Sequence, residues 1–261
     1  MTSAPKYSWK VGNLVCEIRI YEKPNLNNPI LIEGLPGIGL VANIAVAYLI
    51  KKLNAKLFCE IKSSYFHDVA ITDKMGSLKY PSNQLYYYMG SAVGRQDLIL
   101  LYGNTQALGS RGQYEICGRI LDIAESMGCK FVITLGGYRP GRSVVKAKLY
   151  FAASDNETAK IARELGAEAL PIQIFGVAGL LIGICKLRGM RGLCLLSETA
   201  GDRPDKEAAS ELLKALSKIL NIKIDLSDLG DPRDLISAFS PFDFGALSGR
   251  GERKDRPEWF I

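Results

Sequence analysis

A glycine-rich turn holds the residues of this chain whose types and spacing most suggest chemistry. It lies between a short aliphatic run and a long uncharged stretch. Gly37, Gly39 and Ala42 fit the Gly-x-Gly-x-x-Ala form of the dinucleotide-binding fingerprint. Glu60 follows about twenty residues on, where that fingerprint places a ribose-binding acid. A glycine pattern alone is weak support, so a cofactor site is one of two interpretations of this turn.

The second interpretation is structural. Glycine adopts positive φ and allows close backbone approach, and Pro36 fixes its own φ between Gly34 and Gly37. The turn then only connects the buried strand before it to the apolar helix after it. A strand, a tight turn and a buried helix in immediate order are the opening of an α/β unit.

A second glycine turn follows another aliphatic run, at Leu135–Arg142. Gly136 and Gly137 offer backbone amides, and Arg139 and Arg142 add positive charge, which together predict a candidate anion site at the end of a strand. The alternative, which we favour, is a glycine turn with two solvated arginines.

Several kinds of catalytic site lack their residues in this sequence. The single histidine, His67, is the only residue on which a Ser–His–Asp arrangement could depend, and there is no Gly-x-Ser-x-Gly elbow. No P-loop motif is present. The six cysteines contain no Cys-x-x-Cys pair, so no metal site is predicted and the thiols are expected to be free.

Length and composition are typical of one globular α/β domain. The chain has 261 residues, 48% of them hydrophobic, and a formal net charge of +6. This charge is too small and too dispersed to indicate nucleic-acid binding. The N-terminus lacks the apolar stretch of a signal peptide, and the longest uncharged windows (34–50 and 169–185) are short for a membrane span. We therefore expect a cytoplasmic protein without a membrane partner.

The positioning elements alternate between strands and helices. Apolar runs predict strands at Leu57–Ile61, Gln84–Met89, Leu98–Tyr102, Phe131–Leu135, Leu149–Ala153 and Leu193–Leu196. Helical spacing predicts helices from Leu40 to Leu49, over Gln113–Met127, from near Asn156, over Val177–Lys186 and from Pro204 onward. This alternation predicts a mostly parallel or mixed sheet between two helix layers, in a single core domain of residues 1–244.

The remaining residues, 245–261, are rich in glycine and charge, which predicts a flexible tail. The tail nevertheless ends in Trp259, Phe260 and Ile261, which have no local core to join. These side chains either fold back on their own subunit or dock on a partner.

The run Glu33–Ala42, with the apolar helix that follows it, resembles the signature of the proteasome assembly chaperone family. This family includes archaeal homologues of the eukaryotic proteasome assembly chaperones, and the resemblance covers residues 28–222. It implies a three-layer core resembling nucleoside phosphorylases, a homo-oligomer, no enzymatic activity and no cofactor. It also implies a structural role for the motif loop, whose residues are Glu33, Gly34, Pro36, Gly37 and Gly39.

The chain end resembles the hydrophobic–tyrosine–any-residue ending by which proteasome activators enter pockets between α-ring subunits. The resemblance implies that Trp259 is the hydrophobic residue and that Ile261 supplies the carboxylate, which pairs with a lysine of the pocket. Phe260 replaces the tyrosine, and the hydrogen bond so lost is worth about 0.5–1.5 kcal/mol, which weakens docking without abolishing it.

These observations favour a proteasome assembly chaperone or proteasome-binding factor that acts on α subunits or the α ring. Two alternatives remain open. One is a small-molecule enzyme, phosphorylase-like or nucleotide-binding, that uses the two glycine turns. The other is an adaptor that presents the same tail to a different partner.

Overall fold

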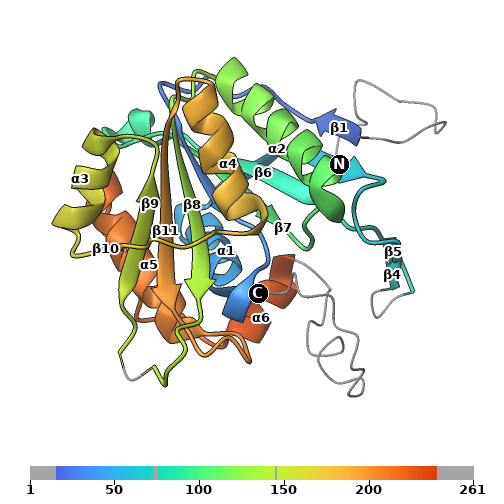
Figure 1. Ribbon diagram of the computed structural model, residues 1–261. Helices are drawn as coiled ribbons and strands as arrows, with labels where there is room; N and C mark the ends of the chain where they lie inside the picture. Colours follow the sequence, from blue (N-terminus) through green and yellow to red (C-terminus); the bar gives the residue numbers. More distant parts are fainter. Residues whose placement is uncertain (1–15, 73–75, 145, 240–261) are drawn as a thin grey trace.

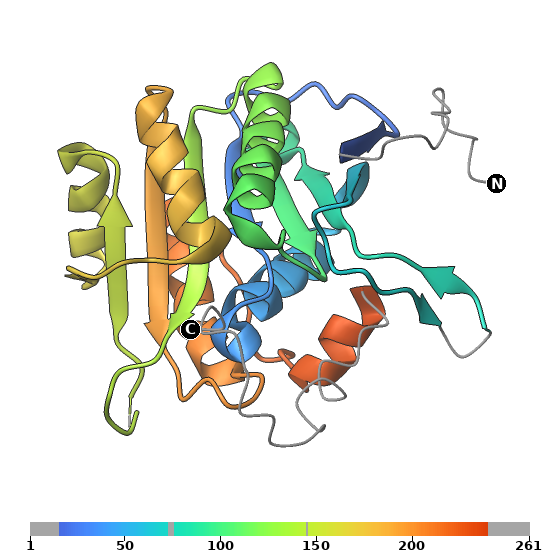
Figure 2. The same ribbon diagram turned by 45° about the vertical axis from the view of Figure 1, so that its right-hand side comes forward.

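The structure is a computed structural model, and it describes residues 16–72, 76–144 and 146–239 (Figure 1). Within these residues a nine-stranded mixed sheet runs in the order β1-β3-β6-β7-β2-β8-β11-β9-β10. Its four central strands, β7, β2, β8 and β11, are parallel, whereas β1, β3 and β6 pair antiparallel beyond β7. A separate two-stranded hairpin, β4–β5, projects from the body of the molecule (Figure 2).

The strands are β1 (Cys16–Ile20), β2 (Ile30–Gly34), β3 (Lys56–Ser63), β4 (Ile71–Thr72), β5 (Leu78–Lys79), β6 (Asn83–Tyr88), β7 (Leu98–Gly103), β8 (Phe131–Tyr138), β9 (Leu149–Ala153), β10 (Glu168–Ala169) and β11 (Arg191–Glu198). The α-helices are α1 (Val41–Leu53), α2 (Gly109–Ser126), α3 (Asn156–Glu164), α4 (Gly176–Leu187), α5 (Lys206–Leu220) and α6 (Pro232–Phe239). Short 3₁₀ turns are η1 (Ile38–Leu40) and η2 (Gly90–Val93).

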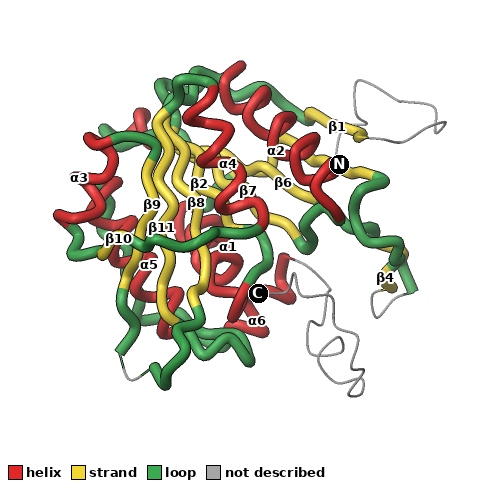
Figure 3. The backbone as a smooth tube through the Cα atoms, in the orientation of Figure 1, coloured by secondary structure: helices red, strands yellow, loops and turns green. Residues whose placement is uncertain are grey.

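Helices cover both faces of the sheet (Figure 3). On one face the apolar core is built with α1, α3, α5 and α6, and on the other with α2 and α4. The strand β7 reads Leu-Ile-Leu-Leu-Tyr-Gly and is buried at every position, because a strand inside a sheet with helices on both faces has protein on both sides. The predicted mixed sheet between two helix layers is therefore confirmed.

Helix α1 occupies the centre of one core. Every residue from Val41 to Ile50 is buried, including Asn43. The helix therefore has no solvent face until Lys51, which agrees with the uncharged sequence that predicted it. Among the described residues no helix has the length and apolar character needed to cross a bilayer.

Several boundaries differ from the sequence prediction; helix α2, for example, begins at Gly109 rather than at Gln113. Two of the differences have a clear physical reason. Strand β8 does not end at Leu135 but continues to Tyr138, because Gly136 and Gly137 pair with Leu196 and Ser197 of the parallel strand β11. Helix α5 begins at Lys206 rather than at Pro204, since Asp205 caps it by accepting a hydrogen bond from the Ala208 backbone N–H at 2.9 Å.

The short or polar elements β1, β4, β5, β10 and α6 were not predicted. Helix α6 ends at Phe239, so the predicted boundary between the core domain (1–244) and the tail (245–261) lies outside the described residues.

Candidate functional site

The motif loop joins β2 to α1 through two left-handed backbone positions. Gly39 has a φ of 61° and Leu40 a φ of 49°, and α1 begins at the next residue. Gly34 stands where the strand meets the helix: a Cβ there would lie 2.4 Å from Cγ2 of Val46. A side chain at Gly34 would therefore push α1 off the sheet.

The second glycine segment lies against this loop. A Cβ on Gly137 of β8 would lie 2.3 Å from the carbonyl oxygen of Ile38, and one on Gly39 would lie 2.8 Å from Oγ1 of Thr199. The Gly201 backbone N–H in turn donates to Oγ1 of Thr199 at 3.1 Å. The two turns that the sequence presents separately thus meet at the carboxyl ends of β2, β8 and β11. A side chain at Gly39 or at Gly137 would clash with the facing segment, so this close packing of the two turns requires glycine at both positions.

This packing does not fit the dinucleotide interpretation. In a dinucleotide site the glycines leave room for a pyrophosphate, whereas here Thr199 and Ile38 fill the space beside Gly39 and Gly137. Glu60 lies on β3, which β6 and β7 separate from β2. Its carboxylate contacts Tyr21 (3.2 Å) and Lys62 (3.4 Å).

Two side-chain amides hold the loop in place, and sequence reasoning missed both. Nδ2 of Asn43 donates to the carbonyl oxygens of Gly34 (3.1 Å) and Gly103 (2.9 Å). Nε2 of Gln106 donates to the carbonyl of Pro36 at 2.6 Å, while its Oε1 accepts from the backbone N–H of Val177 at 3.1 Å. A signal for the first existed, because Asn43 is a polar residue inside an otherwise apolar helix.

Glu33 lies on β2 with its carboxyl group fully buried. Burial raises its pKa to about 8, although the backbone N–H of Leu35, which donates to Oε1 at 2.7 Å, opposes the shift. The backbone of Leu135 also opposes the shift. Because the raised pKa exceeds neutral pH, Glu33 is mostly protonated there, which makes it a neutral structural group.

The arginines of the candidate anion site have unequal surroundings. Nη2 of Arg142 lies 2.6 Å from Oε1 of the buried Glu198, which also accepts from the Tyr150 hydroxyl at 2.8 Å. Burial raises the pKa of Glu198, but these hydrogen bonds outweigh it and hold the pKa below its ordinary value. Arg142 therefore balances a charge of the chain itself. Arg139 is exposed near Gly201. An anion site formed by Gly136, Gly137, Arg139 and Arg142 stays a prediction.

The other reactive residue types have ordinary structural surroundings. Nδ1 of His67 lies 3.0 Å from Oγ1 of Thr105. All six cysteines are free, and burial raises the pKa of Cys59, Cys185 and Cys194 to about 12, so these thiols pack as small apolar groups. The described part of the chain holds no group of three metal-ligating side chains. The predicted docking residues Trp259, Phe260 and Ile261 lie outside the described residues.

Comparison with known proteins identifies relatives over most of the chain. A model of the PAC2 family matches residues 31–234. The uncharacterized protein MJ1210 of Methanocaldococcus jannaschii is 34% identical over 206 residues, which are 78% of each chain.

Solved structures extend the comparison. Pyrococcus furiosus PbaB, described as an archaeal proteasome activator, is 34% identical, with a TM-score of 0.77 over 82% of this chain and 93% of its own. Pyrococcus furiosus PbaA, described as an archaeal homolog of proteasome-assembly chaperone, is 26% identical, with a TM-score of 0.68 over 82% of this chain and 89% of its own.

Proposed function

Because this chain belongs to the PAC2 family, we propose that it is a proteasome-binding protein of the cytoplasm that acts as an assembly chaperone or activator. The similarity to PbaB carries the proposal, since 34% identity over 82% of the chain goes beyond a shared fold. The similarity to PbaA supports the same class of partner. The tight packing of the motif loop supports a structural rather than a catalytic role for its glycines.

The docking element in this proposal is the chain end. Trp259 and Phe260 enter a pocket between α subunits, and burial of each large side chain contributes about 1.5–3 kcal/mol. The terminal carboxylate of Ile261 pairs with a lysine of that pocket. Phe260 lacks the hydroxyl of a tyrosine, so this end binds more weakly than one that ends in tyrosine and one further residue.

Two further features of the chain would favour its association with the proteasome ring. The stretch 250–256 carries Arg250, Arg253, Lys254 and Arg256, and this positive charge would steer the tail toward an acidic ring surface. If the core domain forms a homo-oligomer, it presents several tails at once, and avidity follows where their spacing matches the pockets.

The decisive experiment measures binding of three chains to a cognate proteasome α ring: the full-length chain, a chain ending at Glu258, and a Phe260→Tyr variant. We expect the shortened chain to lose binding and the Phe260→Tyr variant to bind more tightly. A full-length double variant, Trp259→Ser with Phe260→Ser, is the matched control because it keeps the length and the carboxylate. It should also fail to bind.

Other outcomes would contradict parts of the proposal. Equal binding by the full-length and shortened chains would place the contact on the folded core and refute docking by the tail. Failure of every variant to bind would refute the proteasome assignment. A nucleotide that raises the melting temperature would instead favour the enzyme alternative, because a ligand of the native state stabilises it.

A further inference from the structure

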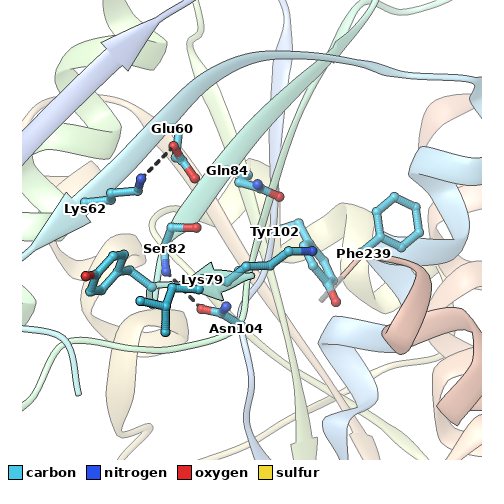
Figure 4. A pocket seen from close by; sticks show the side chains of 11 residues that line it. Glu60, Lys62, Lys79, Ser82, Gln84, Tyr102, Asn104 and Phe239 are labelled. Atoms are coloured by element: carbon cyan, nitrogen blue, oxygen red, sulfur yellow. Dashed lines mark hydrogen bonds and ion pairs between the residues drawn. The ribbon is translucent and has the colours of Figure 1, made fainter. Parts of the chain in front are cut away.

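A pocket of about 290 Å³ lies between strands β3 and β6, the β4–β5 hairpin, the end of β7 and the end of α6 (Figure 4). The side chains that give it its character are two cations, Lys62 and Lys79, and three aromatic residues, Tyr80, Tyr102 and Phe239. Neither the motif loop nor the proposed docking end accounts for this pocket.

The aromatic wall holds an unsatisfied hydroxyl. Phe239 packs on Tyr102 with ring centroids 5.4 Å apart. Tyr102 is only 1% exposed, and its hydroxyl has no hydrogen-bond partner among the described residues. The hydroxyl is itself buried, so what this wall offers an occupant is the apolar surface of the two rings.

The pocket also has a positively charged rim. Lys62 forms an ion pair with Glu60, with 3.4 Å between Nζ and Oε2. Lys79 comes from the exposed end of the β4–β5 hairpin and forms no ion pair within the described parts of the chain. The pocket therefore suits an occupant that carries aromatic rings and a carboxylate close together.

We propose that this occupant is the segment Phe242-Asp243-Phe244 of the same chain. Phe239 both lines the pocket and is the last described residue, so Phe242 begins three residues beyond the wall, within about 10 Å of extended chain. In an extended segment alternate side chains point to opposite sides. Both phenylalanine rings therefore pack on the wall of Tyr102 and Phe239, and Asp243 faces Lys79 on the rim.

This contact, which we call the latch, would hold residues 242–244, just before the tail, against the pocket of the core. Its consequence for proteasome binding rests on the proposed function: the latch leaves residues 245–261 as the docking arm, with a reach of up to about 55 Å. The latch itself is a property of the isolated protein, so it can be tested without a proteasome.

Hydrogen exchange of three chains provides the test: the full-length protein, a chain ending at Phe244 and a chain ending at Phe239. Removal of 245–261 should change nothing in the pocket. Removal of 240–261 should speed amide exchange over residues 78–88 at least about tenfold and lower the melting temperature by about 4 °C. Equal exchange in the two shortened chains would overturn the proposal. A change already present in the chain ending at Phe244 would do so as well, because the occupant would then be the docking end.

A charge exchange tests the contact itself. Lys79→Glu and Asp243→Lys should each speed exchange over residues 78–88, and the two together should restore the protection of the unaltered protein. Lys223→Glu, at an exposed lysine elsewhere, is the matched control and should not rescue Asp243→Lys. Failure of the paired variant to restore protection would overturn the assignment of Asp243 to Lys79. Protection that depends on protein concentration would show that a second copy fills the pocket, which would overturn the proposal.

Discussion

Two buried carboxyl groups have pKa values shifted in opposite directions by their surroundings. Glu33 lies among apolar side chains on β2, where burial raises its pKa to about 8 and favours the protonated form. Glu198 lies at the end of β11, where hydrogen bonds from Tyr150 and Arg142 outweigh burial and keep its pKa low. The first group therefore favours folding at low pH, and the second favours it once the carboxylate is ionised.

The first prediction concerns Glu33. Between its ordinary pKa near 4.5 and about 8, the folded chain holds a proton that the unfolded chain has released, so stability falls as pH rises through this window. Glu33→Gln keeps an acceptor for the Leu35 amide and cannot ionise. Between pH 5 and pH 8, the free energy of unfolding should fall by about 1–3 kcal/mol less in this variant than in the unaltered protein. Denaturant unfolding across this range measures the slope.

Glu164→Gln, at an exposed position, is the control for Glu33→Gln and should leave that slope unchanged. If Glu33→Gln retains the pH dependence of the unaltered protein, Glu33 does not carry a proton in the folded state at neutral pH.

The second prediction concerns Arg142. Arg142→Met leaves the buried Glu198 with Tyr150 as its remaining side-chain partner. The Arg142 side chain is 52% exposed, so solvent screens part of the ion pair, and we expect a loss of about 1–2 kcal/mol at pH 7. The loss should shrink in acid, because Glu198 contributes stability only while it is ionised. Urea unfolding at pH 7 and pH 4 measures both.

Arg139→Met is the matched control for Arg142→Met, since it removes the other arginine of the candidate anion site. It should change stability by less than about 0.5 kcal/mol. Phosphate that raises the melting temperature of the unaltered protein, but not of either arginine variant, would instead support the anion site.

At the scale of elements, the sequence predicted those strands and helices whose burial leaves a pattern. Leu98–Tyr102 and Leu193–Leu196 are continuous apolar runs because β7 and β11 are covered on both faces, and α1 is uncharged up to Ile50 because it fills a core. The edge strands β1 and β10 carry charged residues and pair on one side, so their periodicity is weak. Helix α6 begins at Pro232 and spans only eight residues, too few for a clear pattern.

The candidate site was predicted in parts. The glycines of both turns could be identified as special from the sequence, but their contact could not. It depends on β8 running next to β2 and on β11 pairing with the last residues of β8. The supporting amides of Asn43 and Gln106 come from α1 and from the segment after β7, so only the folded chain brings them to one loop.

The third prediction tests that contact between elements. Gly137→Ala places a methyl group 2.3 Å from the backbone oxygen of Ile38, so strand or loop must move. We expect a loss of about 1–3 kcal/mol. Gly141→Ala, where no atom lies within 4 Å of the added methyl group, should be close to neutral. Thermal unfolding of the two variants measures the difference, and equal melting temperatures would show that the loop adjusts without cost.

At the scale of the whole molecule, the proposed function assigns docking to the chain end and structural support to the folded core. The core has two apolar clusters on opposite faces of one sheet, and the amides of Asn43 and Gln106 hold the motif loop at the sheet's carboxyl edge. Helix α6 packs on α1 and on the aromatic residues Tyr86 and Tyr102, and so fixes the position of Phe239, the last described residue.

The fourth prediction concerns the charge of that chain end. Replacing Arg250, Arg253 and Arg256 with alanine should slow association with a proteasome ring by about tenfold at low salt and leave dissociation nearly unchanged, because distant charges act on the encounter. Salt at 0.3 M should slow the unaltered chain to a similar rate. Surface plasmon resonance separates the two rate constants. An effect confined to dissociation would place the arginines inside the bound interface.

The contact between Gly137 and the Ile38 carbonyl also restricts how this fold can diverge over time. A lineage cannot add a side chain at Gly137 without first shifting the Ile38 carbonyl, so the order in which substitutions can accumulate is constrained. The outer faces of α2 and α3 carry no such restriction. Related chains should therefore keep the short stretches around residues 34–39 and 136–137 long after the rest of their surfaces have become unrecognisable.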